Sequence, residues 1–197
     1  MASLKSFKLY SVLTLLSGLF LFVAWVLFTF GFFKRDYSSA PYYIPIYLDY
    51  FGAILLLFAL IGFYLYHLNS SGKFLTFSFI IGITGTILSL GMKYLGLFVN
   101  PYINKIAPNV LSAPPESPLI EGMVLSFLVY AIGVILIGIN IMKSKKLPFL
   151  GGLVFAVSPF FEFVPVAGVP LNSLLLGLAL VYLGVSLYRK DSAVSPS

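Results

Sequence analysis

Four ionisable side chains lie within long apolar runs of this sequence: Asp49, Lys93, Glu121 and Glu162. A charged side chain in hydrocarbon costs about 3 kcal/mol on insertion scales, so such residues are expected to pair or to face water. Lys93 is the only lysine or arginine inside these runs. We therefore predict that Lys93 pairs with Asp49 or Glu121 and that the four side chains form one polar cluster.

Two hypotheses account for this polar cluster. In the first, the four side chains lie close enough to the lipid headgroups to reach water, and any pairing only fixes the register of the helices. In the second, the cluster binds a cation, a polar lipid headgroup or a quinol-like molecule, with a carboxylate whose proton affinity is raised by its surroundings. The shallow depth predicted for all four residues, in the outer third of the membrane, favours the first hypothesis.

The remaining residue types offer little chemistry. The chain has no cysteine and a single histidine, His67. A haem held between helices usually needs two axial side chains and a catalytic zinc needs three protein ligands, so His67 alone supplies neither. Its expected role is that of an interfacial anchor. Because the sequence also has no phosphate-binding loop and no Ser/His/Asp set, we predict no catalytic residue, no cofactor, no metal and no enzymatic activity.

Composition identifies the environment that must hold these residues. Hydrophobic residues make up 60% of the 197 residues and charged residues only 9%, with a mean hydropathy of +1.04. A soluble fold of this size still exposes about a third of the surface of its unfolded chain and could not hide so much apolar side chain. The lysines and arginines lie between apolar runs and form no basic patch of the size that nucleic acid requires. The sequence therefore predicts an integral membrane protein in contact with lipids, without a nucleic acid partner.

Six apolar runs are long enough to cross a membrane, which requires about 20 helical residues. They cover residues 9–33, 44–68, 74–99, 119–142, 147–164 and 169–188. The fifth is the weakest, because Pro159 lacks the backbone donor that a continuous helix needs. The sequence thus predicts an all-α integral membrane protein, with one six-transmembrane-helix bundle as the single domain over residues 1–197. Its outer loop, residues 100–118, is rich in proline, which favours an extended cover.

Lysine and arginine flank these predicted spans unevenly. If both termini are cytoplasmic, the inner side holds more of them than the outer side, as the positive-inside rule requires. The inner set is Lys5, Lys8, Lys73, Lys143, Lys145, Lys146, Arg189 and Lys190, and the outer set is Lys34, Arg35 and Lys105. We therefore predict a location in the cell membrane with both termini in the cytoplasm (N-in/C-in), and a polar vestibule beneath the outer loop. A similarity between residues 62–75 and 138–150 also suggests repeated hairpins.

Small residues recur at helical spacing in the third, fifth and sixth predicted spans. They are Gly82, Gly85 and Ser89, then Gly152 and Ala156, then Ser173, Gly177 and Gly184. Such faces let helices approach closely in a membrane. We expect them to pack inside the bundle or against a partner.

Three stretches in this order carry a resemblance to a known group: "PIYLDYFGAILLLFALIGFYLYHLNSSGKFLTFSFIIGITG", "KSKKLPFLGGLVFAVSPF" and "LLLGLALVYLGVSLYRK". In "KSKKLPFLGGLVFAVSPF", Leu147, Pro148, Gly151 and Gly152 form a Leu-Pro-x-x-Gly-Gly turn that opens the fifth predicted span, and "GVSLY" closes the sixth. From about residue 45 to residue 190, the chain resembles a broad group of uncharacterised six-helix prokaryotic membrane proteins. The resemblance implies the six-span layout and brings no activity, ligand or catalytic residue.

These observations together predict a non-catalytic accessory or scaffolding subunit of a larger membrane complex, with other membrane subunits as partners. A respiratory or other energy-converting complex is one setting compatible with this role, although no residue identifies it. The alternative is a small transporter or binding protein that uses the outer vestibule for a cation, a lipid headgroup or a quinol-like ligand. A transporter should have polar residues or broken helices in both halves of its path. The inner halves of these predicted spans carry no charged residue, which favours the accessory subunit.

Overall fold

The computed structural model describes residues 4–30, 40–68, 72–166 and 168–194, and almost all of them are helical. This confirms the all-helical class predicted from the sequence. One element, η2, is a π-helix and another, η3, is a 3-10 helix. In chain order the elements are α1 (Leu4–Thr29), α2 (Ala40–His67), α3 (Lys73–Tyr94), η2 (Leu95–Val99), α4 (Asn100–Ile106), α5 (Pro108–Ser112), α6 (Leu119–Ser144), α7 (Phe149–Val157), η3 (Ser158–Phe163), β1 (Pro165–Val166), β2 (Val169–Pro170) and α8 (Asn172–Val194).

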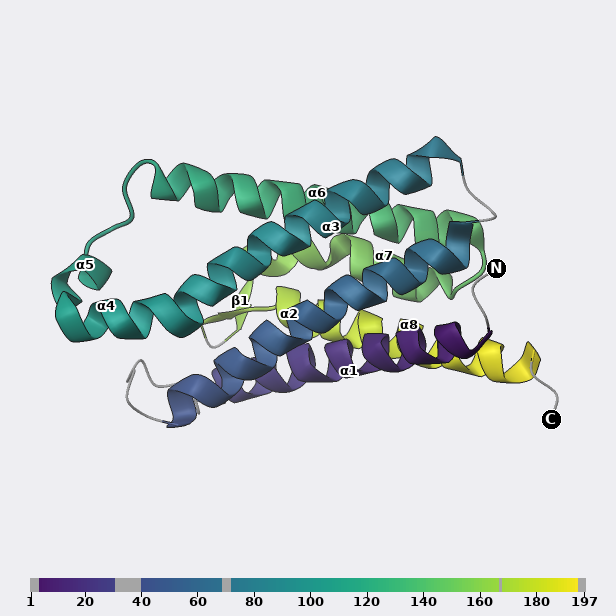
Figure 1. Ribbon diagram of the computed structural model, residues 1–197, viewed down its shortest axis with the longest axis horizontal. Helices are drawn as coiled ribbons and strands as arrows, with labels where there is room; N and C mark the ends of the chain where they lie inside the picture. The colour runs from purple at the N-terminus through teal and green to yellow at the C-terminus, as the bar shows by residue number, and fades with distance from the viewer. Residues whose placement is uncertain (1–3, 31–39, 69–71, 167, 195–197) are drawn as a thin grey trace.

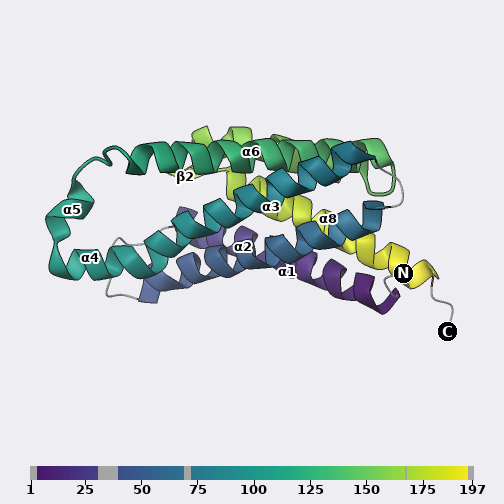
Figure 2. The same ribbon diagram turned by 45° about the horizontal axis from the view of Figure 1, so that its top comes forward.

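The long helices run side by side in one elongated bundle (Figure 1). α1 packs against α2 and α8, α3 packs against α6, and α7 contacts both α6 and α8. The beginning of α1 and the end of α8 lie at the same end of the bundle, which we call the terminal end (Figure 1). At the opposite end, which we call the far end, α4 and α5 extend beyond the other helices (Figure 2).

Five helical segments are long and apolar enough to cross a membrane. Each of them corresponds to one of the six predicted spans. Residues 31–33 of the first predicted span lie outside the described residues, as do Lys34 and Arg35 of the predicted outer side. The five segments are Phe7–Thr29, Pro41–His67, Lys73–Ile106, Leu119–Ser144 and Asn172–Lys190.

The predicted fifth span, residues 147–164, is a shorter and broken helix. α7 has 9 residues and η3 has 6, and together they form the apolar segment Phe149–Phe163. The α-helical pattern ends at the turn that contains Pro159, which has no N–H to donate. The chain then forms a two-stranded hairpin in which Pro165 pairs with Pro170, and α8 begins only at Asn172. Six full-length spans are therefore not confirmed, and the fifth is corrected to a short helix followed by a hairpin.

The proline-rich segment 100–118 is not the extended cover that the sequence predicted. α3 continues through η2 into α4, and the amide of Asn100 donates to the carbonyl of Leu95, five residues earlier. This π-type turn accommodates Pro101, whose missing N–H falls in the first turn of α4, where a helix needs no partner. Pro108 begins α5 in the same way. The first half of the segment is therefore helical and projects from the far end.

Glycines allow several helices to approach each other closely. A Cβ atom added at Gly85 of α3 would collide with the backbone Cα of Tyr130 on α6. α1 and α8 meet at Gly18 and Gly177, where a Cβ added at Gly18 would lie 2.6 Å from the Gly177 carbonyl oxygen. A Cβ added at Gly152 of α7 would lie 2.9 Å from side chains of α6. The predicted small-residue faces of α3, α7 and α8 thus pack within the bundle.

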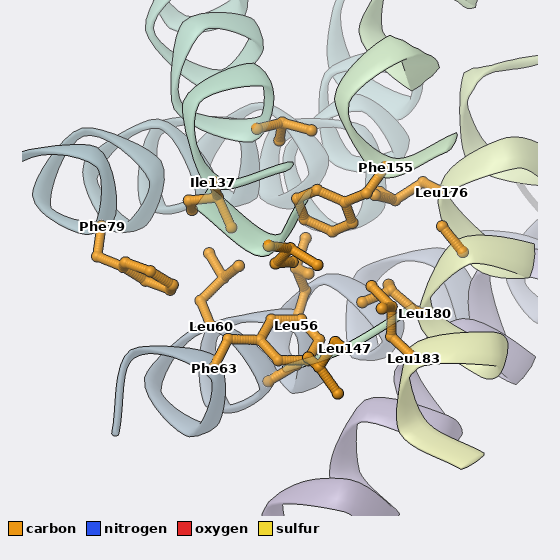
Figure 3. Packing of buried hydrophobic residues seen from close by; sticks show 14 of the residues in the cluster. Leu56, Leu60, Phe63, Phe79, Ile137, Leu147, Phe155, Leu176, Leu180 and Leu183 are labelled. Carbon is orange, nitrogen blue, oxygen red and sulfur yellow. The ribbon is translucent and has the colours of Figure 1, made fainter. Parts of the chain in front are cut away.

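A hydrophobic core fills the interior toward the terminal end. Leu60 and Phe63 of α2, Ile137 of α6, Phe155 of α7 and Leu180 of α8 are fully buried and converge from four helices (Figure 3). The rings of Phe63 and Phe155 meet edge to face, with their centroids 6.5 Å apart. The charged side chains of Asp49, Lys93 and Glu162 lie in the other half of the bundle, beyond this core.

Candidate functional site

A cavity of about 610 Å³ lies between the helices in the half of the bundle toward the far end. Its lining comes from α1, α2, α3, α6, η3, β2 and α8. Leu56 and Leu176 belong both to this lining and to the hydrophobic core, so the core forms the floor of the cavity. Ligand pockets in proteins typically measure about 300–1,000 Å³ and combine apolar walls with a few polar groups. The cavity has this size and composition.

An ion pair between Asp49 of α2 and Lys93 of α3 forms part of the cavity wall. Asp49 and Lys93 side chains are only 17% and 26% exposed. The predicted pairing of Lys93 is confirmed, and Asp49 is its partner rather than Glu121. Because each partner neutralises the other, the pair can remain in an apolar bundle at a lower cost than either charge alone.

The pair lies further from the ends of its two helices than the predicted spans implied. The second predicted span begins at residue 44, where the apolar run begins, whereas α2 begins at Ala40. Asp49 is therefore about 13 Å along the helix from its start. The helix that carries Lys93 also continues to Ile106, about 20 Å further along the chain.

Glu162 and Asn172 meet at another part of the cavity wall. Glu162 lies in η3 and Asn172 opens α8, and the hairpin between them brings the two side chains together. Asn172 Nδ2 donates a hydrogen bond to Glu162 Oε2 at 2.7 Å. The other amide atom, Asn172 Oδ1, is buried and has no hydrogen-bond partner among the described residues. Sequence reasoning placed Glu162 in the cluster and missed Asn172.

Glu121 does not join the other three residues. It is exposed on the outer side of α6, where its Oε1 accepts a hydrogen bond from Ser117 Oγ at 2.6 Å. The side of α6 that faces the cavity carries Met123, Phe127 and Tyr130. Glu121 precedes Tyr130 by a spacing that turns it about 180° around the helix. The predicted four-residue cluster is therefore corrected to Asp49, Lys93 and Glu162.

The hairpin of β1 and β2 covers one side of the cavity. Gly168, Val169 and Pro170 belong to the lining, and Gly168 takes a left-handed backbone conformation with φ of 81°. Trp25 of α1 donates from Nε1 to the carbonyl oxygen of Pro170 at 2.8 Å and so fastens the hairpin to α1. The predicted cover, residues 100–118, supplies none of the lining residues in the part of the chain that the structure describes. The proline and glycine pattern of residues 165–170 was the sequence signal for this turn.

His67 lies away from the cavity, near the terminal end. Its Nδ1 is 2.7 Å from the carbonyl oxygen of Phe63 and its Nε2 is 2.9 Å from Ser144 Oγ. The side chain is 1% exposed, which contradicts the predicted role of an interfacial anchor. It instead ties the end of α2 to the end of α6. In the part of the chain that the structure describes, no group of three or more His, Cys, Asp or Glu side chains is placed to hold a metal ion.

Comparisons with protein-family models, with curated proteins and with solved structures found no match to this chain. The resemblance to six-helix prokaryotic membrane proteins therefore stays a prediction. The candidate site rests on its own geometry: a largely apolar cavity that contains an ion pair, a carboxylate and an unpaired amide oxygen.

Proposed function

We propose that this protein is an integral membrane protein that binds a small amphiphilic molecule in the cavity between its helices. The observation that carries the proposal is the cavity of about 610 Å³, in which mostly apolar walls surround three charged side chains. An amphiphilic ligand matches both parts of such a site, because its body contacts the apolar walls and its polar group contacts the charges.

A purely structural role explains this arrangement less well. An ion pair that only fixed the register of α2 and α3 would need neither an adjoining cavity nor a third charged side chain. Glu162 comes from a different part of the chain and lines the same space as Asp49 and Lys93. Charged groups around a space in an apolar bundle are costly unless water or a ligand solvates them. A bound ligand would stabilise these charged groups and so offset that cost.

The proposed orientation places the terminal end in the cytoplasm. Lys73, Lys143, Lys146 and Lys190 border the helix ends there, as the positive-inside rule requires. The long helices α1, α2, α3 and α6 then cross the membrane, and α7 with η3 enters from the cytoplasmic side and returns through the hairpin as α8. Non-helical backbone at membrane depth is tolerated where it lines a cavity. The hairpin meets that condition, and the cavity falls in the outer half of the membrane.

Binding is better supported than transport. A transport path needs polar positions or broken helices on both sides of the site. Toward the terminal end, Phe63, Phe155 and Leu180 close the interior with fully buried side chains. A ligand could reach the cavity from the outer side and would meet this core as a barrier.

The role of accessory or scaffolding subunit stays a prediction, as does the expectation of other membrane subunits as partners. The small-residue faces that favoured it pack within the bundle, so they no longer indicate an external partner. Purification in mild detergent separates the two roles. Co-migrating chains would favour the subunit, whereas a monomer that carries a small molecule would favour the binding protein.

Two phenylalanine variants of α6 test the binding proposal. Ser126→Phe places a large side chain in the cavity, whereas Leu125→Phe places the same group on the outer surface. Wild type and both variants are expressed in the same cells, purified in mild detergent, extracted with organic solvent and compared by mass spectrometry. We expect a small molecule in wild type and Leu125→Phe that is missing from Ser126→Phe. The proposal fails if wild type carries none, or if Ser126→Phe retains all that wild type carries.

A further inference from the structure

The charges that line the cavity do not cancel. Asp49 and Lys93 neutralise each other, which leaves the carboxyl group of Glu162. Among the residues that the structure describes, Glu162 has no ion-pair partner, and its hydrogen bond comes from the neutral amide of Asn172. The described lining therefore has one more acidic than basic side chain. Its field favours a cation over a neutral or anionic molecule.

Asn172 holds the carboxyl group of Glu162 in place at the cavity. Its Nδ2 donates to Glu162 Oε2, which fixes the orientation of the amide, because the reverse orientation would set two oxygens against each other. Its Oδ1 is consequently turned away from Glu162, and it is buried without a partner. Asn172 as a whole is 8% exposed and lines the cavity. Because this oxygen has almost no accessible surface, the acceptor of this pair that a molecule in the cavity can meet is the carboxylate of Glu162.

The cavity walls around Glu162 and Asn172 suit a cation with an apolar body. Trp25, Phe127 and Tyr130 all belong to the lining. Aromatic ring faces attract cations, with tryptophan the most effective. Met92 and Met123 also line the cavity, and their flexible thioether side chains adapt to apolar groups of irregular shape.

We propose that the molecule bound in the cavity is a protonated organic amine. Its ammonium group lies against the carboxylate of Glu162 and donates an N–H to it, and its apolar body packs against Trp25. The proposal rests on the binding function assigned to the cavity and adds the chemical class of the ligand.

Four probes with one phenethyl body test this assignment. They are 2-phenylethylammonium, the neutral 2-phenylethanol, the anionic phenylacetate, and trimethyl(2-phenylethyl)ammonium, which keeps the charge but has no N–H. Trp25 is the single tryptophan of the chain and lines the cavity, so its fluorescence in the full-length protein reports occupancy. We expect 2-phenylethylammonium to bind about tenfold more tightly than 2-phenylethanol. The trimethyl derivative should fall between them, and phenylacetate should bind most weakly.

Charge variants identify the group responsible. Glu162→Gln removes the charge and keeps an oxygen that can accept from Asn172, so it should bind 2-phenylethylammonium and 2-phenylethanol about equally. Glu162→Lys should reverse the preference and bind phenylacetate best. Glu121→Gln is the matched control, because it removes the same charge from the outer side of α6. It should keep the wild-type preference.

The outcomes separate this proposal from the one on which it rests. Equal binding of the cation and the alcohol by wild type, or an unchanged preference in Glu162→Gln, would overturn the amine and leave the cavity as a binding site. If none of the four probes changes Trp25 fluorescence in wild type, both proposals fail. Circular dichroism and gel filtration check the folding of each variant. If Glu162→Gln does not fold, the comparison of the four probes on wild type still decides whether the cavity prefers the protonated amine.

Discussion

Lys93→Met tests the ion pair at the centre of the candidate site. Methionine is close to lysine in length and keeps the apolar contacts of its stem, so the substitution mainly removes the charge. Asp49 then remains without a cation in a position where it is 17% exposed. The variant should therefore be less stable than wild type even though little packing is lost.

The magnitude follows from the exposure of the two partners. Breaking a fully buried ion pair costs about 3–5 kcal/mol, whereas a fully exposed pair contributes about 0–1 kcal/mol. Asp49 and Lys93, at 17% and 26% exposed, lie between these limits. We therefore expect Lys93→Met to lower the free energy of unfolding by about 2 kcal/mol. Asp49→Asn leaves the Lys93 ammonium without an anion, but it should cost less, because the amide oxygen still accepts a hydrogen bond and Lys93 is the more exposed of the two side chains.

A double-mutant cycle isolates the interaction. Wild type, Lys93→Met, Asp49→Asn and the double variant are unfolded with sodium dodecyl sulfate in mixed micelles and followed by circular dichroism. The double variant should be more stable than the sum of the single effects predicts, with a coupling energy of about 1–2 kcal/mol. Glu121→Gln combined with Lys93→Met serves as the control and should show no coupling. Additivity within about 0.5 kcal/mol for the Asp49–Lys93 cycle would refute the reasoning.

Three further substitutions test the packing around the site. Gly85→Ala forces a Cβ atom against the backbone of α6 and should lower the free energy of unfolding by about 1–3 kcal/mol. Gly91→Ala in the same helix meets open space and should not lower it. Chemical unfolding compares the two variants. Trp25→Phe removes the hydrogen bond to Pro170 and should lower the free energy of unfolding by about 1 kcal/mol. It should also speed amide hydrogen exchange in the hairpin, and unchanged exchange would contradict this. Asn140→Val removes a 2.8 Å hydrogen bond from α6 to a serine of α3 and should cost about 0.6 kcal/mol; a stabilised variant would contradict this.

Composition and charge counting were enough to predict the helical class and one half of the candidate site. Lys93 was the only basic residue within the apolar runs, so its pairing with a carboxylate followed from the cost of an unpaired charge. Helical periodicity would also have excluded Glu121. Met123, Phe127 and Tyr130 follow the spacing of one helix face, and Glu121 falls on the opposite face.

The rest depended on tertiary structure that local patterns do not encode. Pro159 indicated a break in the fifth predicted span, but only the folded chain shows that a hairpin follows and brings Asn172 to Glu162. The role of Trp25 depends on a hydrogen bond to Pro170, far along the sequence. Prolines in residues 100–118 were expected to extend the chain. Pro101 instead starts a helical turn, because helix starts tolerate proline and the π-type turn before it absorbs the misfit.

Thiol labelling tests the central claim, a water-accessible cavity inside the bundle, most directly. The chain has no cysteine, so Ser126→Cys and Leu125→Cys each provide a single thiol, one facing the cavity and one facing outward. The account predicts that a water-soluble maleimide labels Ser126→Cys in lipid vesicles, that 2-phenylethylammonium slows this labelling, and that Leu125→Cys in contact with lipid reacts far more slowly. An unreactive Ser126→Cys, or equal labelling of the two positions, would contradict it.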